Sequence, residues 1–273
     1  MYQVTTLETC RFGLDGGAMF GVVPKPLWER VYAKADERNR IPMAARCLLL
    51  QGNGKTILVD TGNSTEMPPK LLDIYGIDFS EYSLKGALAL QGIRPEDVTD
   101  VILTHLHFDH SGGAVIHGEP AFPNARYYVQ KHHLEWARNP SVKDRASFES
   151  YMYEPLAVHG VLELLDGPGT LFDGVDLELF HGHTPFMQSV IIQTTDGTLF
   201  YPADLFPTAA HIPVAYGMAY DNQPLVTVQE KQTIHSRIID ENWTIVFEHD
   251  AFVSHARLRM GPKGPIIVTV DNA

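Results

Sequence analysis

The chain has 273 residues, of which 44% are hydrophobic and 20% are charged. This composition is typical of a globular protein and excludes a fibrous or intrinsically disordered one. The formal net charge of −12 at pH 7 repels polyanions, so we expect no nucleic acid partner.

The length and the scattered placement of proline and glycine predict a single domain over residues 1–273. The N-terminus has no basic region followed by an apolar stretch, and no window approaches the roughly 18 apolar residues that span a bilayer. Cys10 and Cys47 are far apart in the sequence, and we interpret both as reduced, buried thiols. These features predict a cytoplasmic protein without a membrane partner.

The first predicted elements are a β-hairpin and a helix. Apolar residues 48–50 and 56–59 flank a turn that contains glycine and asparagine, which is typical of a hairpin. Residues 83–91 have a helical apolar pattern that begins at a serine cap and ends at Gly92. A buried strand over residues 99–103 then leads into a polar loop.

The rest of the chain alternates predicted strands with helices. Strands are predicted near 126–129 and at 161–165, 176–180, 189–194, 198–202, 244–247, 252–259 and 265–270, and helices near 130–137 and at 224–240. Mixed strands with helices on the outside favour two packed sheets that are covered by helices.

A dense cluster of metal-binding residue types, His105-Leu106-His107-Phe108-Asp109-His110, follows the strand over 99–103. Alternate residues of an extended segment point the same way, so His105 and His107 can offer two imidazoles to one ion. Asp109 and His110 come where the chain turns and can serve a second ion. Imidazole and carboxylate without thiolate suit zinc, manganese, iron or cobalt.

The segment from Thr104 to Gly113 resembles the signature loop of the metallo-β-lactamase superfamily. Further matches follow in the expected order: Val59-Asp60-Thr61-Gly62, Gly182-His183-Thr184-Pro185, Tyr201-Pro202-Ala203-Asp204 and Phe247-Glu248-His249. The resemblance covers most of the chain. It implies an α+β fold, the four-layered αββα sandwich, with a metal site at one edge of its two sheets.

The resemblance also implies two divalent metal ions, zinc first, with manganese, iron or cobalt as alternatives. The implied ligands are His105, His107 and His183 for the first metal, Asp109, His110 and His249 for the second, and Asp204 as the bridge between them. A carboxylate suits the bridging position because each of its oxygens can reach one cation.

Asp60 ends a buried strand, where an unpaired carboxylate is costly. The comparable aspartate of the family implies a hydrogen bond to the imidazole of a metal ligand, which commonly donates its other N–H to a carboxylate. The alternative is a local turn cap with Thr61 or Gly62.

Two cations that share a water lower its pKa and polarise a carbonyl oxygen under attack. We therefore predict a binuclear hydrolase that uses a metal-bridging hydroxide, with Asp109 as the catalytic residue that assists protonation of the leaving group. The sequence around Phe108 resembles the branch with acyl-homoserine-lactone lactonases and organophosphate or aryl ester hydrolases, so the predicted substrate is a lactone or another small carboxylic ester. The alternatives are an organophosphate, aryl ester or thiolester hydrolase and, from another class, a mononuclear iron dioxygenase acting on a persulfide.

Several residues are candidates for the surroundings of the site. The predicted apolar lining consists of Met19, Phe20, Phe186, Met187 and Phe206. Phe186 stands where the family usually has glycine, a change expected to reshape the pocket. The lactonases tend to carry a tyrosine shortly after the bridging aspartate, and Tyr216 or Tyr220 is the candidate replacement here.

His211 is either a substrate contact or proton shuttle, or a histidine bonded within its loop. We interpret His132, His133, His235 and His255 as structural. The apolar content of a predicted helix at 27–36 and of the loop 206–223 favours a homodimer.

Overall fold

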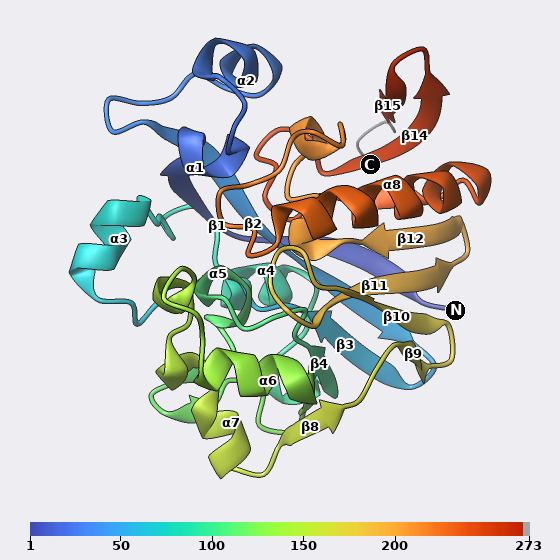
Figure 1. Cartoon of the computed structure of the whole chain (residues 1–273). Coiled ribbons are helices and arrows are strands. Elements are labelled where there is room, and N and C mark those ends of the chain that lie inside the picture. Colours follow the sequence, from blue (N-terminus) through green and yellow to red (C-terminus); the bar gives the residue numbers. More distant parts are fainter. Residues whose placement is uncertain (270–273) are drawn as a thin grey trace.

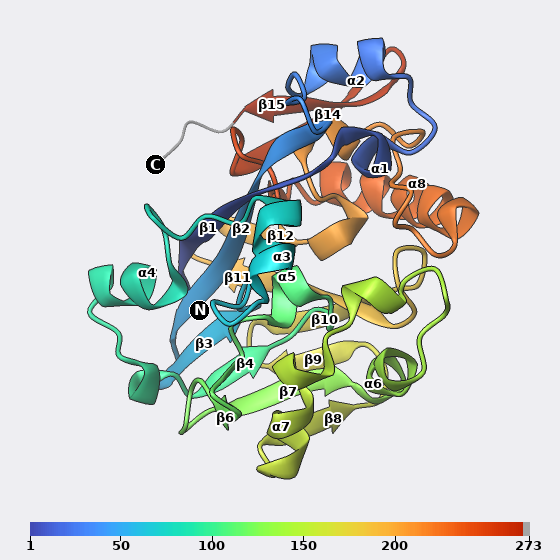
Figure 2. The ribbon, with the colours of Figure 1, turned by 90° about the vertical axis from the view of Figure 1, so that its left-hand side faces the viewer.

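The computed structural model describes residues 1–269 and contains two β-sheets that pack face to face, with helices on both outer faces (Figure 1). The first sheet has the strand order β1-β2-β3-β4-β7-β8, and the second has β15-β14-β13-β12-β11-β10-β9. A view turned by 90° places α4 and α8 on opposite sides of the strands (Figure 2). The predicted αββα sandwich is confirmed.

The strands of the first sheet are β1 (Gln3–Asp15), β2 (Arg40–Gly52), β3 (Lys55–Val59), β4 (Asp100–Ile102), β7 (Arg126–Gln130) and β8 (Leu162–Leu165). Those of the second are β9 (Gly169–Phe172), β10 (Val175–Phe180), β11 (Met187–Thr194), β12 (Gly197–Tyr201), β13 (Thr244–Val246), β14 (His255–Gly261) and β15 (Gly264–Thr269). A small separate hairpin is formed by β5 (Val115–Ile116) and β6 (Glu119–Pro120).

The helices are α1 (Gly16–Phe20), α2 (Lys25–Val31), α3 (Pro69–Tyr75), α4 (Leu84–Leu90), α5 (Phe108–Ser111), α6 (Lys131–Arg138), α7 (Glu154–Val158) and α8 (Pro224–Asp240). Among the described residues, none of these helices has the length and apolar character needed to cross a membrane.

The core is divided by the sheets, as strand β2 illustrates. Leu48 and Leu50 face the second sheet, whereas Cys47 and Leu49 face a cluster that contains α4, α6 and α7. The strand is therefore apolar on both faces, as a strand covered on both sides must be. On the far side of the second sheet, α8 buries its apolar residues against β11, β12 and β13. Burial of each leucine or isoleucine side chain stabilises the folded chain by about 1.5–3 kcal/mol.

Local signals explain the elements that were predicted well. The β2–β3 turn has positive φ angles of 50° at Asn53 and 74° at Gly54, the conformation that two-residue hairpin turns require. Ser83 caps α4 by accepting a hydrogen bond from Gly86 N. Helix α8 has the predicted bounds.

Other predictions were wrong or incomplete. The helix predicted at 27–36 corresponds to α2, which begins two residues earlier at Lys25 and already ends at Val31. The strand predicted at 252–259 begins only at His255, because Asp250 Oδ1 accepts hydrogen bonds from the backbone of the next residues and makes a turn. Strand β1 was not predicted, since threonines interrupt its apolar pattern. Val270, the last residue of the predicted strand 265–270, lies outside the described residues.

The topology brings several loops to one edge. Strands β3 and β4 are parallel in the first sheet, and β12 and β13 are parallel in the second. The segments that follow these four strands therefore leave at the same end of their sheets. They contain Asp60, the motif from His105 to His110, Asp204 and His249.

Candidate metal centre

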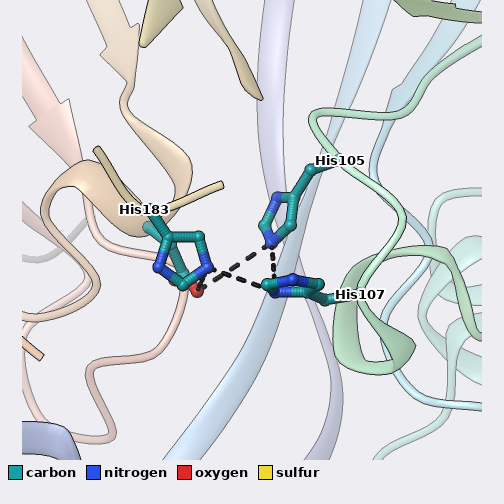
Figure 3. Close-up of side chains that lie close together, drawn as sticks. His105, His107 and His183 are labelled. Carbon is teal, nitrogen blue, oxygen red and sulfur yellow. Dashed lines mark hydrogen bonds and ion pairs between the residues drawn. The ribbon is translucent and has the colours of Figure 1, made fainter. Parts of the chain in front are cut away.

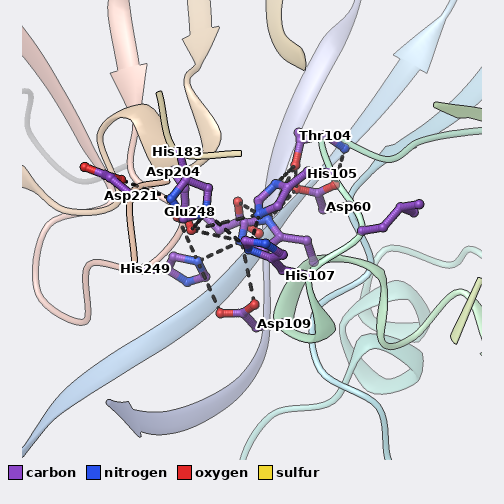
Figure 4. A network of polar contacts seen from close by, with 12 residues as sticks. Asp60, Thr104, His105, His107, Asp109, His183, Asp204, Asp221, Glu248 and His249 are labelled. Atoms are coloured by element: carbon purple, nitrogen blue, oxygen red, sulfur yellow. Dashed lines mark hydrogen bonds and ion pairs between the residues drawn. The ribbon is translucent and has the colours of Figure 1, made fainter. Parts of the chain in front are cut away.

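The structure brings all seven predicted metal ligands together at this edge, and Figure 4 labels each of them except His110. These residues are buried, with relative exposures of at most 7% for the whole residue. They form two donor groups, which we call the first donor group (His105, His107 and His183) and the second donor group (Asp109, His110 and His249), with Asp204 between them.

In the first donor group, three imidazole nitrogens converge (Figure 3). His107 Nδ1 lies 3.1 Å from His105 Nε2 and 3.1 Å from His183 Nε2. His107 Nε2 is buried and has no hydrogen-bond partner. The two strand-end histidines thus face the same point, as their alternation predicts, and His183 reaches it from the loop after β10.

In the second donor group, His110 Nε2 and His249 Nε2 lie 3.1 Å apart. The Asp109 carboxylate stands beside both, with one oxygen 3.9 Å from His110 Nε2 and the other 3.7 Å from His249 Nε2. Asp109 and His110 belong to the single turn α5, which begins directly after His107.

Asp204 lies beside both groups. Its Oδ2 is 3.1 Å from His183 Nε2, 3.6 Å from His110 Nε2 and 4.0 Å from His105 Nε2, whereas its Oδ1 is 3.2 Å from His249 Nε2. Asp204 Oδ1 is buried without a hydrogen-bond partner. Such a carboxylate is costly unless a cation compensates it.

Hydrogen bonds on the far side of four rings fix which nitrogen faces inward. The pairs are His105 Nδ1 with Thr104 Oγ1 at 3.1 Å, His110 Nδ1 with Asp60 Oδ2 at 3.0 Å, His183 Nδ1 with Asp221 Oδ1 at 3.1 Å and His249 Nδ1 with Ala44 O at 2.9 Å. In a neutral ring of such a pair the outer nitrogen carries the proton, so the inner nitrogen keeps its lone pair. Where two inner lone pairs face one another at 3.1 Å, they repel unless a cation lies between them.

The electrostatics agree with this arrangement. Burial and the neighbouring imidazoles hold the pKa of His105 and of His107 well below the ordinary value. Both rings are therefore neutral, which is the form that binds a metal. In the second donor group, burial lowers the pKa of His249, but Asp204 and the other carboxylates outweigh it and raise that pKa to about 9. A cation that binds there competes with a proton.

The residues present therefore suit a site for two metal ions. Seven buried side chains present nitrogen and oxygen atoms only, and the two donor groups share Asp204. The donor set without thiolate matches zinc, manganese, iron or cobalt.

Three carboxylates support the ligands from behind. The predicted hydrogen bond between Asp60 and a ligand imidazole is confirmed by its contact with His110. Glu248 Oε2 also lies 3.1 Å from His110 Nδ1. Neither the role of Glu248 nor that of Asp221 was predicted. Asp221 lies in an irregular loop without a motif, and Glu248 was noted only as the neighbour of His249.

A cavity of about 120 Å³ opens onto the two donor groups. Its lining outside the ligands consists of Leu14, Met19, Tyr75, Phe108, Lys143, Ala146, Ser147, Met218 and Tyr220. Of the five apolar residues predicted to line the pocket, Met19 does so. The prediction was wrong for Phe20, Met187 and Phe206, whose side chains are fully buried in hydrophobic clusters and do not line the cavity.

Phe186 also lies outside the cavity lining, so the prediction that it lines the pocket was wrong. Its ring packs against His132 and His181, at centroid distances of 5.0 and 4.9 Å. Its φ of 61° lies in the left-handed region that favours glycine. The structure therefore gives a backbone reason for the glycine that the family usually has here.

Of the two candidate tyrosines, Tyr220 lines the cavity, whereas Tyr216 packs edge-on against Phe20. His211 is bonded within its surroundings, since Nδ1 pairs with Thr208 Oγ1 at 2.7 Å and Nε2 donates to Met19 O at 2.8 Å. The substrate-contact role of His211 is therefore not supported by its position. His133, interpreted as structural, accepts a hydrogen bond from Leu106 N and donates to Pro185 O.

Comparison with known proteins identifies the family. Residues 40–249 match the model of the metallo-beta-lactamase superfamily. This match covers more than half of the chain and includes all seven candidate ligands. The chain belongs to the metallo-β-lactamase superfamily, as its sequence motifs predict.

The curated relatives are lactonases. N-acyl homoserine lactonase AiiA of Bacillus thuringiensis subsp. kurstaki is 30% identical over 162 residues, which cover 54% of this chain and 58% of the lactonase. N-acyl homoserine lactonase of Bacillus cereus is 28% identical over 169 residues, which cover 57% of this chain and 61% of that lactonase. The chain thus spans less than two thirds of the length of these relatives.

Solved structures match over the whole chain. A probable metal-dependent hydrolase from Staphylococcus aureus superposes with a TM-score of 0.90 at 26% identity, covering 100% of this chain and 98% of the other. AidC, a dizinc quorum-quenching lactonase in complex with a product, superposes with a TM-score of 0.82 at 20% identity, covering 100% and 95%. The likeness to AidC, at 20% identity, supports the assignment of the fold alone.

Proposed function

We propose that the protein is a hydrolase with two divalent metal ions, zinc first, and that it acts on lactones or other carboxylic esters, including acyl-homoserine lactones. The observation that carries the proposal is the pair of buried donor groups with the Asp204 carboxylate between them, 3.1 Å from His183 Nε2 and 3.2 Å from His249 Nε2. A mononuclear iron site requires only one of these groups, so the second would have no purpose there.

Two divalent ions in such a site supply a solvent nucleophile near neutral pH and polarise the carbonyl oxygen under attack. The chain's own residues provide the surroundings for this chemistry. The Asp109 carboxylate lies on the cavity wall, where it can hold the proton that a leaving alkoxide needs. Tyr220 and Tyr75 line the same cavity and can orient a bound ester by hydrogen bonds.

Two further observations support the substrate class. The relatives with matching sequence are named N-acyl homoserine lactonases. The cavity wall also contains apolar side chains, among them Leu14, Met19 and Met218, which suit an acyl group. Apolar walls with a few polar groups are typical of small-molecule sites.

The test is a substrate panel for the zinc-loaded protein, with hydrolysis followed by proton release. We expect turnover of N-hexanoyl homoserine lactone or a simple lactone, and loss of turnover after chelation. Asp109→Asn should lower kcat by about 10²–10⁴-fold. A metal-loaded protein that prefers thiolesters or phosphotriesters would redirect the substrate class, and turnover only of persulfides with a single iron would contradict the hydrolase.

The support for the predicted homodimer comes from α2. Leu27 and Val31 of this helix are 43% and 50% exposed, whereas Phe206 and Met218 of the loop 206–223 are buried inside the chain. The exposed apolar residues of α2 therefore support the dimer, and the loop does not. A monomer mass by light scattering at working concentration would contradict it. The cytoplasmic location stays a prediction.

A further inference from the structure

Behind the first donor group, one connected set of side chains joins the segment between α6 and α7 to the loop before α8. At its centre is Asp144, which is 4% exposed. Its Oδ2 accepts hydrogen bonds from Asn222 Nδ2 at 2.7 Å and Trp136 Nε1 at 2.8 Å, and its Oδ1 accepts one from Ser141 Oγ at 2.7 Å. A buried carboxylate bonded on both oxygens is a fixed anchor point.

From this anchor, two consecutive residues reach His183. Asn222 donates to His183 O from its backbone N at 2.9 Å and from Nδ2 at 3.1 Å. Asp221 Oδ1 accepts from His183 Nδ1 at 3.1 Å. The backbone of His183 is therefore held by Asn222, which Asp144 fixes, and its ring is held by Asp221, the residue directly before Asn222.

The same segment makes two further contacts with the first donor group and its supports. Lys143 Nζ donates to Asp221 O at 2.7 Å and to Tyr220 O at 3.0 Å. The Phe148 ring packs against His107, with ring centroids 4.7 Å apart at an angle of 66°. Residues 143–148, which we call the brace, thus act on His183 through the loop and on His107 directly.

The second donor group has a different support. His110 Nδ1 faces Asp60 and Glu248, which follow β3 and β13, and His249 Nδ1 donates to Ala44 O within β2. These supports belong to the two sheets and their strand ends. Among the seven candidate ligands, the contacts of the brace described above lead to His107 directly and to His183 through the loop.

We propose that the brace positions His107 and His183 and thereby sets the metal affinity of the first donor group without touching a metal. The inference rests on the proposed function, because it concerns the metals of that site. Loss of Asp144 or Lys143 weakens metal binding at the first donor group and leaves binding at the second unchanged. Groups that orient metal ligands typically change affinity by about 10–100-fold.

The experiment measures zinc affinity by chelator competition in two backgrounds of the full chain. His249→Ala disables the second donor group, and His183→Ala disables the first. In the His249→Ala background, Asp144→Ala should weaken zinc binding by about 10-fold, whereas in the His183→Ala background the affinity should stay unchanged. Asp144→Asn keeps an oxygen for Asn222 and Trp136, so it should restore most of the affinity.

The matched control is Asp100→Ala. Asp100 is also buried and accepts hydrogen bonds from Lys55, Thr99 and Tyr128. It is the first residue of β4, whereas the metal ligands follow the last residue of this strand. If Asp144→Ala weakened zinc binding no more than Asp100→Ala, or weakened it equally in both backgrounds, the brace would be refuted. Lys143→Ala provides the same test if Asp144→Ala does not fold. A wild-type chain that binds no zinc would instead refute the proposed function.

Discussion

Two loops at the metal centre are held in different ways. The ligand loop (residues 104–111) leaves β4 beside its parallel neighbour β3. Asp60, which follows β3, accepts hydrogen bonds from Thr104 N at 2.7 Å and Thr104 Oγ1 at 2.6 Å. Thr61 N donates to His110 O at 2.8 Å. The ligand loop is therefore secured by the residues that directly follow the adjacent strand.

The closing loop (residues 205–223) follows Asp204 and contains only short 3₁₀ turns. Two lysines hold it. Lys231 of α8 is 1% exposed, and its Nζ donates to His211 O at 3.0 Å and Tyr216 O at 2.8 Å. Lys143 holds the other end through the carbonyls of Tyr220 and Asp221.

The comparison indicates that the two loops have different roles. The ligand loop carries four of the seven candidate ligands and is held by buried, short hydrogen bonds, so damage there should act on the metals first. The closing loop carries no ligand between the ends that Lys231 and Lys143 hold, so damage at its Lys231 end, away from the supports of His183, should act first on stability and on the shape of the site. Substitutions in each loop can break or sharpen this distinction.

The largest effect is expected at Asp204, where the two loops meet. Asp204→Ala removes the carboxylate that faces both donor groups, so metal affinity should fall by more than about 100-fold and hydrolysis should reach the background rate. Metal content after dialysis and kcat together check this. Retention of two tightly bound ions would show that Asp204 is not the bridge.

The next effect is expected at Asp60 in support of the ligand loop. Asp60→Ala leaves Thr104 N and Oγ1 without their acceptor and removes one of the two carboxylates at His110 Nδ1, so we expect a loss of about 3 kcal/mol in the free energy of unfolding and a roughly 10–100-fold weaker metal affinity. Urea unfolding and chelator competition measure the two quantities. A stability loss with unchanged metal affinity would mean that Asp60 acts on the fold alone.

A smaller effect is expected at Lys231 in the closing loop. Lys231→Met leaves two buried carbonyls without a donor, which costs about 1–3 kcal/mol near neutral pH, with little change in metal content. Urea unfolding together with elemental analysis tests this separation. Loss of metal comparable to that in Asp60→Ala would break the distinction between the loops.

The same lysine gives a pH signature. Burial lowers the pKa of Lys231 from 10.5 to about 8. Below pH 8 the side chain is charged in both the folded and the unfolded chain, so folding carries the full penalty of burying the charge. Between pH 8 and 10.5 the unfolded chain binds more protons, so the stability of the wild type relative to Lys231→Met should rise with pH. A flat difference would mean that Lys231 stays charged in the folded chain.

The smallest effect is expected at Phe186. Phe186→Gly relieves a left-handed conformation that costs a non-glycine residue about 1–2 kcal/mol, but it removes the packing against His132 and His181 and increases the freedom of the unfolded chain. We expect a net change within about 1 kcal/mol and an unchanged kcat. Thermal unfolding and a standard assay measure both. A clear change in kcat would show that Phe186 affects the cavity after all.

The two loops also differ in how far the sequence predicts them. The motif from His105 to His110 follows a buried strand, so strand alternation and residue type were enough to predict two metal positions. Asp60 was predictable as well, because a carboxylate at the end of a buried strand needs a partner. These signals are local, and the structure places the side chains accordingly.

The closing loop gave no such signals. Tyr220 and Asp221 reach the site because Lys143 and Lys231 hold the backbone, and those contacts join residues that are 15 to 78 positions apart. Nothing in the pattern of apolar residues marks them. For the same reason the cavity lining was mostly mispredicted, since Phe20 and Phe206 are apolar for packing with Trp28 and His235 rather than for a substrate.

The most direct test of the account is the number of metal ions that the wild-type chain binds, measured by titrating zinc into metal-free protein with elemental analysis of the product. The account predicts two ions per chain, with fewer after substitution of a residue in either donor group. A wild-type chain that saturates at one ion, or that binds none, would contradict the two donor groups joined by Asp204.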